Sequence, residues 1–364
     1  MREAVLHHLA ALVGFDTRNP PRAIGTGGIF DYLRDALPGF EIHVADHGAG
    51  AVSMLAVRGN PTRVFNVHLD TVPSSEAWTD DPLTLRIEGD RAIGLGACDI
   101  KGAAACLVAA AELTDGDAAF LFTTDEEAND ARCIAAFLAS NHGFSEALIA
   151  EPTRCEAVLA HRGISSVLLR FKGRAGHASG AEAREASAVH HALRWGAQAL
   201  EHAASHDPER FGGLTGLRFN IGRVDGGIKG NVIAPSCEVR FNFRPLPSQS
   251  TDALHATLRG LVDPAALDTY EETFRGPSLP AGDIAAAEER RLAARDLADA
   301  LDLPIGNAVD FWTEASLFSQ AGLTAFVFGP GDIAQAHTAD EWVALDQLDA
   351  YAAHAVRLLG GARA

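Results

Sequence analysis

The sequence predicts an α/β sandwich with a mostly parallel sheet, interrupted by a smaller α+β domain of ferredoxin-like type. Near both ends of the chain, short and continuously apolar segments alternate with helical patterns, which is typical of parallel strands covered by helices. In the middle of the chain, apolar and polar residues alternate, as they do in strands with one solvated face. The 364 residues are enough for two domains.

The α/β sandwich has four predicted strands, each read from a short apolar run. They are residues 64–70, 118–127, 146–153 and 324–331. The predicted helices that accompany them are residues 101–113, 131–141, 285–302 and 345–359. The first 17 residues have the apolar spacing of an amphipathic helix, and the charged and polar residues Glu3, His7 and His8 within it argue against a signal peptide.

The middle of the chain is predicted to follow the order strand, helix, strand, strand, helix, strand. The segments are residues 165–173, 186–203, 217–227, 237–245, 251–262 and 269–276. This order is that of a split β-α-β unit of ferredoxin-like type. We therefore expect an inserted domain over residues 163–275, with residues 1–162 and 276–364 forming the two parts of the α/β sandwich.

Composition excludes several classes of function. The formal net charge of −18 argues against broad binding of nucleic acids or anionic membranes, because phosphate surfaces attract Lys and Arg. The longest apolar helix candidate, residues 102–111, is bounded by Lys101 and Glu112 and is shorter than the ~20 residues of a membrane span. The five cysteines show no CxxC spacing, which favours a reducing compartment. We expect a cytoplasmic protein that handles small molecules or metal cations.

Ionisable residues gather where the predicted strands of the sandwich end. They are His68 and Asp70 at the end of the first strand, Glu126 and Glu127 at the end of the second, Glu151 at the end of the third, His337 beyond the fourth, and Asp99 before a helix. Taken singly, each has an ordinary interpretation as a solvated turn residue, or, for His68, as a hydrogen-bonded core histidine. Together they lie at the edge of the sheet where α/β proteins bind ligands. Two histidines with several carboxylates suit zinc or a similar divalent ion, and their number suits two ions.

Six segments spread over essentially the whole chain form a recognisable set. They are NVHLDTVP, GLGACDIKG, TTDEEAND, AEPT, GRAGHAS and GPGDIAQAHTADE. In these segments and in their order, the chain resembles the M20 metallopeptidase and deacylase family. WTEA and the last of these segments are similar to the acetylornithine deacetylase branch. GFDTRNPPRAI and GNAVDFWTEASLFS are similar to its subgroup that acts on N-acetyl-L-citrulline.

The resemblance implies an enzyme that hydrolyses the acetyl amide of N-acetyl-L-citrulline, giving L-citrulline and acetate in arginine biosynthesis. Acetylornithine, succinyl-diaminopimelate and dipeptides remain alternative substrates. Citrulline differs from ornithine only by a neutral ureido group in place of an ammonium, and the residues that distinguish the two are not identified by the sequence.

The resemblance also implies a role for each residue at the strand ends, around two Zn²⁺ or Co²⁺ ions. One ion is held by His68, Asp99 and Glu151, and the other by Asp99, Glu127 and His337, so that Asp99 bridges them. Asp70 accepts the ring N–H of His68, and Glu126 is the general base.

In the inserted domain the resemblance implies three further site residues. His177 acts in the active site of the partner subunit, which implies a homodimer through residues 163–275. Asn231 and Arg244 bind the carboxylate of the substrate. Simpler interpretations stay open: His177 as the cap of a turn beside Gly176, and Arg244 as the partner of an acidic neighbour.

The sequence argues against two other functions. A nucleotide-binding oxidoreductase is suggested by the glycines of GLGACDIKG, but the third glycine and the later acidic residue of that fingerprint are missing. A metal-binding relative without activity would keep the ligands and lose the base, whereas Glu126 is present.

Overall fold

The computed structural model describes residues 1–128 and 130–360. Asn129, within the TTDEEAND segment, and the last four residues of the predicted catalytic domain lie outside the described residues. The chain divides into two compact units. The first consists of Met1–Leu159, Leu292–Gly306 and the chain from Thr313 onwards, and the second of Ala160–Arg291 and Asn307–Trp312. The segment 163–275, predicted as an insertion, lies inside the second unit.

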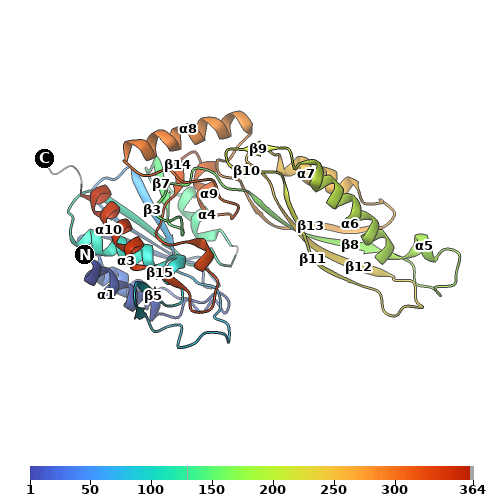
Figure 1. Ribbon diagram of the computed structural model, residues 1–364, viewed down its shortest axis with the longest axis horizontal. Coiled ribbons are helices and arrows are strands. Elements are labelled where there is room, and N and C mark those ends of the chain that lie inside the picture. Colours follow the sequence, from blue (N-terminus) through green and yellow to red (C-terminus); the bar gives the residue numbers. More distant parts are fainter. Residues whose placement is uncertain (129, 361–364) are drawn as a thin grey trace. The chain divides into compact units, whose positions relative to one another are not determined.

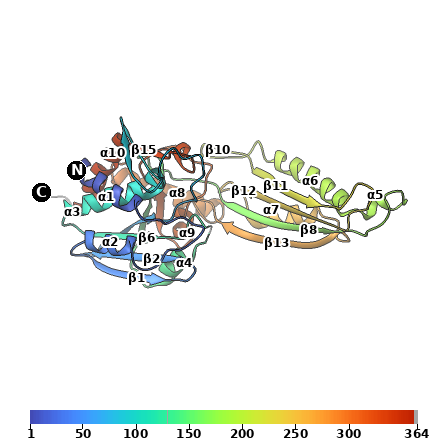
Figure 2. The ribbon, with the colours of Figure 1, turned by 90° about the horizontal axis from the view of Figure 1, so that it is seen from below.

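The first unit is built on a six-stranded sheet (Figures 1 and 2). In spatial order its strands are β1 (Glu41–Asp46), β2 (Val52–Arg58), β6 (Ala118–Thr123), β3 (Arg63–His68), β7 (Glu146–Ile149) and β14 (Thr324–Val327). The last four are parallel to one another, whereas β2 pairs antiparallel with both β6 and β1. The predicted mostly parallel sheet is confirmed. The sequence did not predict β1 and β2; β1 is a largely exposed edge strand without an apolar run.

Helices accompany this sheet. They are α1 (Arg2–Val13), α2 (Ile29–Ala36), α3 (Gly102–Glu112), α4 (Arg132–Ala139), α9 (Ala315–Gln320), α10 (Leu345–Leu359) and, from Leu292 onwards, α8 (Ile284–Ala300). The sequence predicted all of these helices except α2 and α9. Helix α3 contacts both α1 and α10. Its sequence, GAAACLVAAAE, is rich in small residues that allow such close approach, and all but its last residue are buried.

Both faces of the inner strands β3, β6 and β7 are buried, which explains their continuous apolar runs. Phe65 and Val67 of β3 join the main core cluster, whose other members come mainly from α1, α2, α3 and α10. The alternate residues of the same strand, Val64 and Asn66, are also buried although they point to the opposite face. The strands are therefore fixed on both sides, and their carboxyl ends are held rigidly.

A small antiparallel sheet adjoins the turn that contains Asp99. Its order is β15 (Trp342–Ala344), β5 (Arg91–Ile93) and β4 (Arg86–Glu88). Strand β5 leads into the irregular turn Ala97–Lys101 that precedes α3, and β15 follows the segment with His337. Strands of three residues have no periodicity to detect, and the sequence did not predict them.

The second unit has the predicted β-α-β-β-α-β order. Its main elements are β8 (Ile164–Lys172), α6 (Ala188–Ser205), β11 (Arg218–Gly226), β12 (Ser236–Arg244), α7 (Thr251–Gly260) and β13 (Leu267–Gly276). The short elements are α5 (Ala183–Ala186), β9 (Arg210–Phe211) and β10 (Leu214–Thr215). The sheet order β11-β12-β8-β13, antiparallel throughout, is ferredoxin-like. Trp195 of α6 packs on Phe241 of β12 at the centre of this unit's core.

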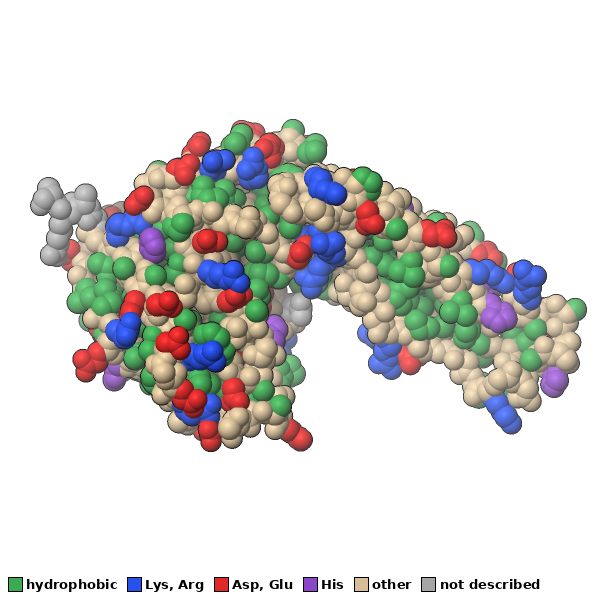
Figure 3. All heavy atoms as spheres, viewed as in Figure 1, with side chains coloured by type: hydrophobic (Ala, Val, Ile, Leu, Met, Phe, Trp, Pro, Cys, Tyr) green, Lys and Arg blue, Asp and Glu red, His purple; other side chains and the backbone are tan. Residues whose placement is uncertain are grey.

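The surface in Figure 3 has acidic and basic side chains interspersed. Among the described residues, no helix is both long and apolar enough to cross a membrane. All five cysteines are buried and have free thiols.

Candidate metal centre and active site

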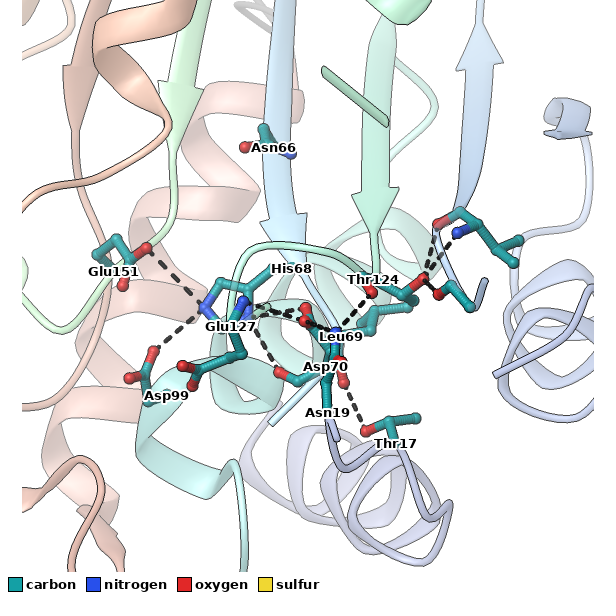
Figure 4. Close-up of polar contacts among 12 residues, drawn as sticks. Thr17, Asn19, Asn66, His68, Leu69, Asp70, Asp99, Thr124, Glu127 and Glu151 are labelled. Carbon is teal, nitrogen blue, oxygen red and sulfur yellow. Dashed lines mark hydrogen bonds and ion pairs between the residues drawn. The ribbon is translucent and has the colours of Figure 1, made fainter. Parts of the chain in front are cut away.

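The parallel strands bring the predicted site residues of the first unit to one edge of the sheet. His68 is the last residue of β3, and Glu151 follows the end of β7 by two residues. Glu127 lies in the turn after β6. Figure 4 shows His68, Asp99, Glu127 and Glu151 facing one another at this edge.

Asp99 lies between the two histidines. Its Oδ1 atom is 3.2 Å from Nε2 of His68, and its Oδ2 atom is 3.4 Å from Nε2 of His337. Each histidine has one further carboxylate neighbour: Oε1 of Glu151 lies 3.9 Å from Nε2 of His68, and Oε1 of Glu127 lies 3.0 Å from Nε2 of His337. The two carboxylate oxygens of Asp99 thus face two separate pairs of possible metal ligands, each consisting of one histidine and one glutamate.

These residues form two groups of three possible ligands, His68 with Asp99 and Glu151, and Asp99 with Glu127 and His337. Within each group the ligand atoms lie within 4.8 Å of one another. Imidazole nitrogens and carboxylate oxygens are ligands that zinc and similar divalent ions accept. The donor sets therefore fit two divalent ions that share one carboxylate.

The pKa values of the buried carboxyl groups also indicate that the site favours bound cations. Burial, together with the charge of Asp99, raises the pKa of Glu151 well above its usual range. Burial also raises the pKa of Glu127. Asp99 is buried too, but hydrogen bonds with His337 and His68 lower its pKa. Crowded carboxylates destabilise one another's ionised form unless positive charge balances them.

Asp70 contacts His68 in a different way from the one implied by the family resemblance. Nδ1 of His68 lies 3.0 Å from the backbone carbonyl oxygen of Asp70 and 3.6 Å from its carboxylate Oδ1. The other carboxylate oxygen accepts hydrogen bonds from Nδ2 of Asn19 at 2.9 Å and from the backbone N–H of Glu127 at 3.0 Å. The nearest acceptor for the ring N–H is therefore the carbonyl of Asp70.

Glu126 lies beside the two groups, in the turn after β6. The sequence predicted this strand through residue 127, but it ends at Thr123, so Glu126 and Glu127 are not neighbours along a strand, whose side chains would point apart. Burial raises the pKa of Glu126 to about 8, and the charges of Glu127, Asp70 and Asp99 add to this effect while that of His68 opposes it. A carboxylate whose pKa lies near neutrality is suited to acid–base catalysis.

Sequence reasoning missed two buried acidic residues around this site, Glu341 and Glu314. Glu341 accepts three backbone hydrogen bonds from the loop that contains Asp99. Burial raises the pKa of Glu314 well above its usual range, and the charges of Asp125 and Glu126 add to this effect. The signal for Glu341 was present in the HTADE sequence, where an acidic residue follows His337 by four positions.

The second unit carries the other three predicted site residues. His177 is exposed, and its Nδ1 atom lies 2.7 Å from the hydroxyl of Ser179. The backbone carbonyl of Asn231 accepts a hydrogen bond from the N–H of Ala178, so the His177 and Asn231 loops lie side by side. Arg244 is the last residue of β12, and partial burial lowers the pKa of its guanidinium although Asp310 opposes the shift.

Comparison with known sequences gives a family and named relatives. The model of peptidase family M20/M25/M40 matches residues 64–360. The N-acetyl-L-citrulline deacetylase of Xanthomonas campestris pv. campestris is 69% identical over 359 residues, which cover 98% of both chains. The acetylornithine deacetylase of Myxococcus xanthus is 31% identical and covers 87% of both chains.

Solved structures share the fold over nearly the whole chain. Aminopeptidase PepT of Bacillus cereus has a TM-score of 0.74 at 18% identity, covering 99% of this chain and 98% of that one. The Bacillus subtilis YXEP protein, a dinuclear metal-binding peptidase, has a TM-score of 0.64 at 15% identity, covering 98% of each chain. At this identity the likeness concerns the fold alone.

Proposed function

Because the chain belongs to peptidase family M20/M25/M40, we propose that it is a metal-dependent amidohydrolase that removes the acetyl group from N-acetyl-L-citrulline. One observation carries the hydrolase part of the proposal. The two carboxylate oxygens of Asp99 face the Nε2 atoms of His68 and His337, each at a distance of less than 3.5 Å. A carboxylate with two histidines on its two sides is suited to bridging a pair of ions.

In this proposal the two groups of three residues hold one Zn²⁺ or Co²⁺ ion each. His68, Asp99 and Glu151 are the ligands of one ion, and Asp99, Glu127 and His337 are those of the other. Ions bound there would polarise the amide carbonyl and acidify the attacking water. Asp70 orients His68 through its carbonyl and Glu127 through its carboxylate.

Glu126 acts as the general base. It takes a proton from the water that attacks the acetyl carbonyl, and it delivers this proton to the leaving nitrogen as the C–N bond breaks. Acetate and the free amino acid are the products. The raised pKa of Glu126, about 8 in the absence of ions, supports this role because the group then exchanges protons near neutral pH.

The substrate is assigned from the relatives. Identity of 69% over 98% of the chain supports N-acetyl-L-citrulline as the substrate. We propose that this reaction is a step of arginine biosynthesis in the cytoplasm. Acetylornithine is the second candidate, favoured by relatives at 31% identity. Asn231 and Arg244 bind the substrate carboxylate, a task that suits the planar guanidinium fork of Arg244.

The second unit, with the inserted segment 163–275, makes the protein a homodimer in this proposal. Strand β11 is an edge of its sheet, and its Val224 side chain is more than half exposed. Leu193 and Leu200 on α6 are also more than half exposed. An open strand edge and exposed apolar side chains support pairing with a second copy. His177 then contributes to the active site of the partner subunit.

The proposal is tested by measuring kcat/KM for N-acetyl-L-citrulline, N-acetyl-L-ornithine and N-succinyl-diaminopimelate side by side. We expect the highest value for N-acetyl-L-citrulline. A preference for N-acetyl-L-ornithine would support the proposed deacetylation but show that the proposed substrate is wrong. No activity on any of the three would refute the deacylase function.

A further inference from the structure

We propose that Glu341 is a positioning residue that holds the Asp99 loop in its ligand geometry and fixes this loop relative to His337. This inference rests on the proposed function, because it concerns the carboxylate that would bridge the two ions. It assigns a role to a buried carboxylate that neither binds an ion nor exchanges a proton with the substrate.

The first support is the set of hydrogen bonds that Glu341 accepts. Its Oε1 atom accepts the backbone N–H of Cys98 at 2.8 Å and that of Asp99 at 2.9 Å. Its Oε2 atom accepts the N–H of Gly96 at 2.9 Å. Three N–H groups of one short loop thus converge on a single carboxylate, which is 1% exposed.

These contacts replace the regular structure that the loop lacks. The loop follows β5, and Gly96 has a φ of +76°, in the left-handed region. A Cβ atom at Gly96 would lie 2.6 Å from the Cγ2 atom of Thr71, so this residue is restricted to glycine. Gly96, Cys98 and Asp99 lie at the start of the Ala97–Lys101 turn, where the first N–H groups have no partner within the turn, so a side-chain acceptor satisfies them.

The second support is the position of Glu341 in the chain. It follows His337 by four residues, and it directly precedes β15, which pairs with β5. The backbone carbonyl of Glu341 also accepts the N–H of Gly94 at 3.0 Å. Glu341 therefore connects the segment that contains His337 to the loop that contains Asp99, and it constrains the separation of these two proposed ligands.

Only a carboxylate suits this arrangement. A glutamine of the same shape has one acceptor oxygen, and its NH₂ group would face at least one of the three N–H donors. Glu341→Gln should therefore distort the loop without creating a cavity. We expect the affinity for Zn²⁺ or Co²⁺ to fall by about 10- to 100-fold, as it does when outer partners of metal ligands are removed.

The matched control is Asp340→Asn. Asp340 lies in the same segment as Glu341. Its carboxylate accepts hydrogen bonds from the backbone N–H of Thr79 and from the guanidinium of Arg86, whereas that of Glu341 accepts them from the Asp99 loop. Asparagine tolerates the positive φ of this position, +53°. A purely structural effect of disturbing the segment would appear in both variants as a lower Tm. Only Glu341→Gln should also change the visible spectrum of the Co²⁺-loaded protein.

The experiment measures binding of Zn²⁺ and Co²⁺ to metal-free full-length protein by competition with a chromogenic chelator, together with the Co²⁺ spectrum. Weaker binding and an altered spectrum in Glu341→Gln, with Asp340→Asn like the wild type, would support the inference. Wild-type affinity and spectrum in Glu341→Gln would overturn it. If the wild type binds neither ion, the proposed function itself fails, and that result is distinct from a failure of this inference.

A second measurement needs no variant. In the metal-free wild type, we expect the amides of Gly96, Cys98 and Asp99 to be protected from hydrogen exchange, because Glu341 already holds them. Fast exchange of these three amides without metal, with protection only after addition of Zn²⁺, would show that the ion organises the loop, and would overturn the inference.

Discussion

The Nδ1 atom of His68 lies 3.0 Å from the backbone carbonyl oxygen of Asp70, closer than the 3.6 Å that separates it from the carboxylate of the same residue. A carbonyl acceptor fixes Nδ1 as the protonated nitrogen and leaves Nε2 free for an ion. The carboxylate, which is fully buried, holds Asn19 and the backbone of Glu127. Asp70 therefore supports one proposed ligand of each ion.

Asp70→Ala should weaken binding of both ions, because it releases Glu127 and removes the buried charge beside His68. We expect a loss of about 10- to 100-fold in affinity, measured by competition with a chelator. Thr17→Val is the control, since it removes the 2.6 Å hydrogen bond to the carbonyl of neighbouring Leu69 without touching the carboxylate. Equal affinities in the two variants would contradict this role of Asp70.

Glu126→Gln should abolish most of the turnover and leave the ions in place. Gln keeps the shape of the side chain but cannot take a proton, so kcat should fall by about 100- to 10,000-fold. The measurement pairs steady-state kinetics with elemental analysis of the same sample. If the ion content falls together with the rate, Glu126 is a ligand and the assigned role is wrong.

His337→Ala should reduce the ion content of the protein from two to one per chain. The group formed by His68, Asp99 and Glu151 keeps its three donors, whereas the other group is left with two carboxylates. Elemental analysis after dialysis tests this, with His43→Ala, an exposed histidine on β1, as the control. Two ions retained in the His337 variant would remove this residue from the ligands.

His177→Ala and Glu126→Ala should complement each other if His177 acts across a dimer interface. Each variant alone should be nearly inactive, and a mixture that exchanges subunits should regain activity, because some sites then combine an intact base with an intact His177 of the partner subunit. The rate of acetate release by the mixture is the measurement. Confirmed subunit exchange without recovery of activity would argue against a role of His177 in the partner's site.

The fold was predictable from the sequence wherever an element has a pattern of its own. Helix α10 spans the predicted residues 345–359, and β3, buried on both faces, produced the continuous apolar run that marked it. Strands β4, β5 and β15 have three residues each and depend on pairing with one another, so no local pattern indicates them.

The candidate site was predictable to the extent that strand ends define it. His68 and Glu151 stand at or just after the ends of β3 and β7, and the parallel sheet brings such positions together. The contacts that support them were not predictable. Glu341 accepts a hydrogen bond from the backbone N–H of Asp99, although the two residues are 242 positions apart in the sequence. The hydrogen bond between His68 and the backbone carbonyl of Asp70 depends on the local conformation of the backbone, which no sequence pattern indicates.

The most direct test of the central claim is a titration of metal-free protein with Zn²⁺ or Co²⁺ during hydrolysis of N-acetyl-L-citrulline. We predict that acetate release is absent without ions, rises as they are added and reaches its maximum at about two ions per chain, as a pair of sites sharing Asp99 requires. Full activity in protein shown by elemental analysis to contain no divalent ion would contradict the account.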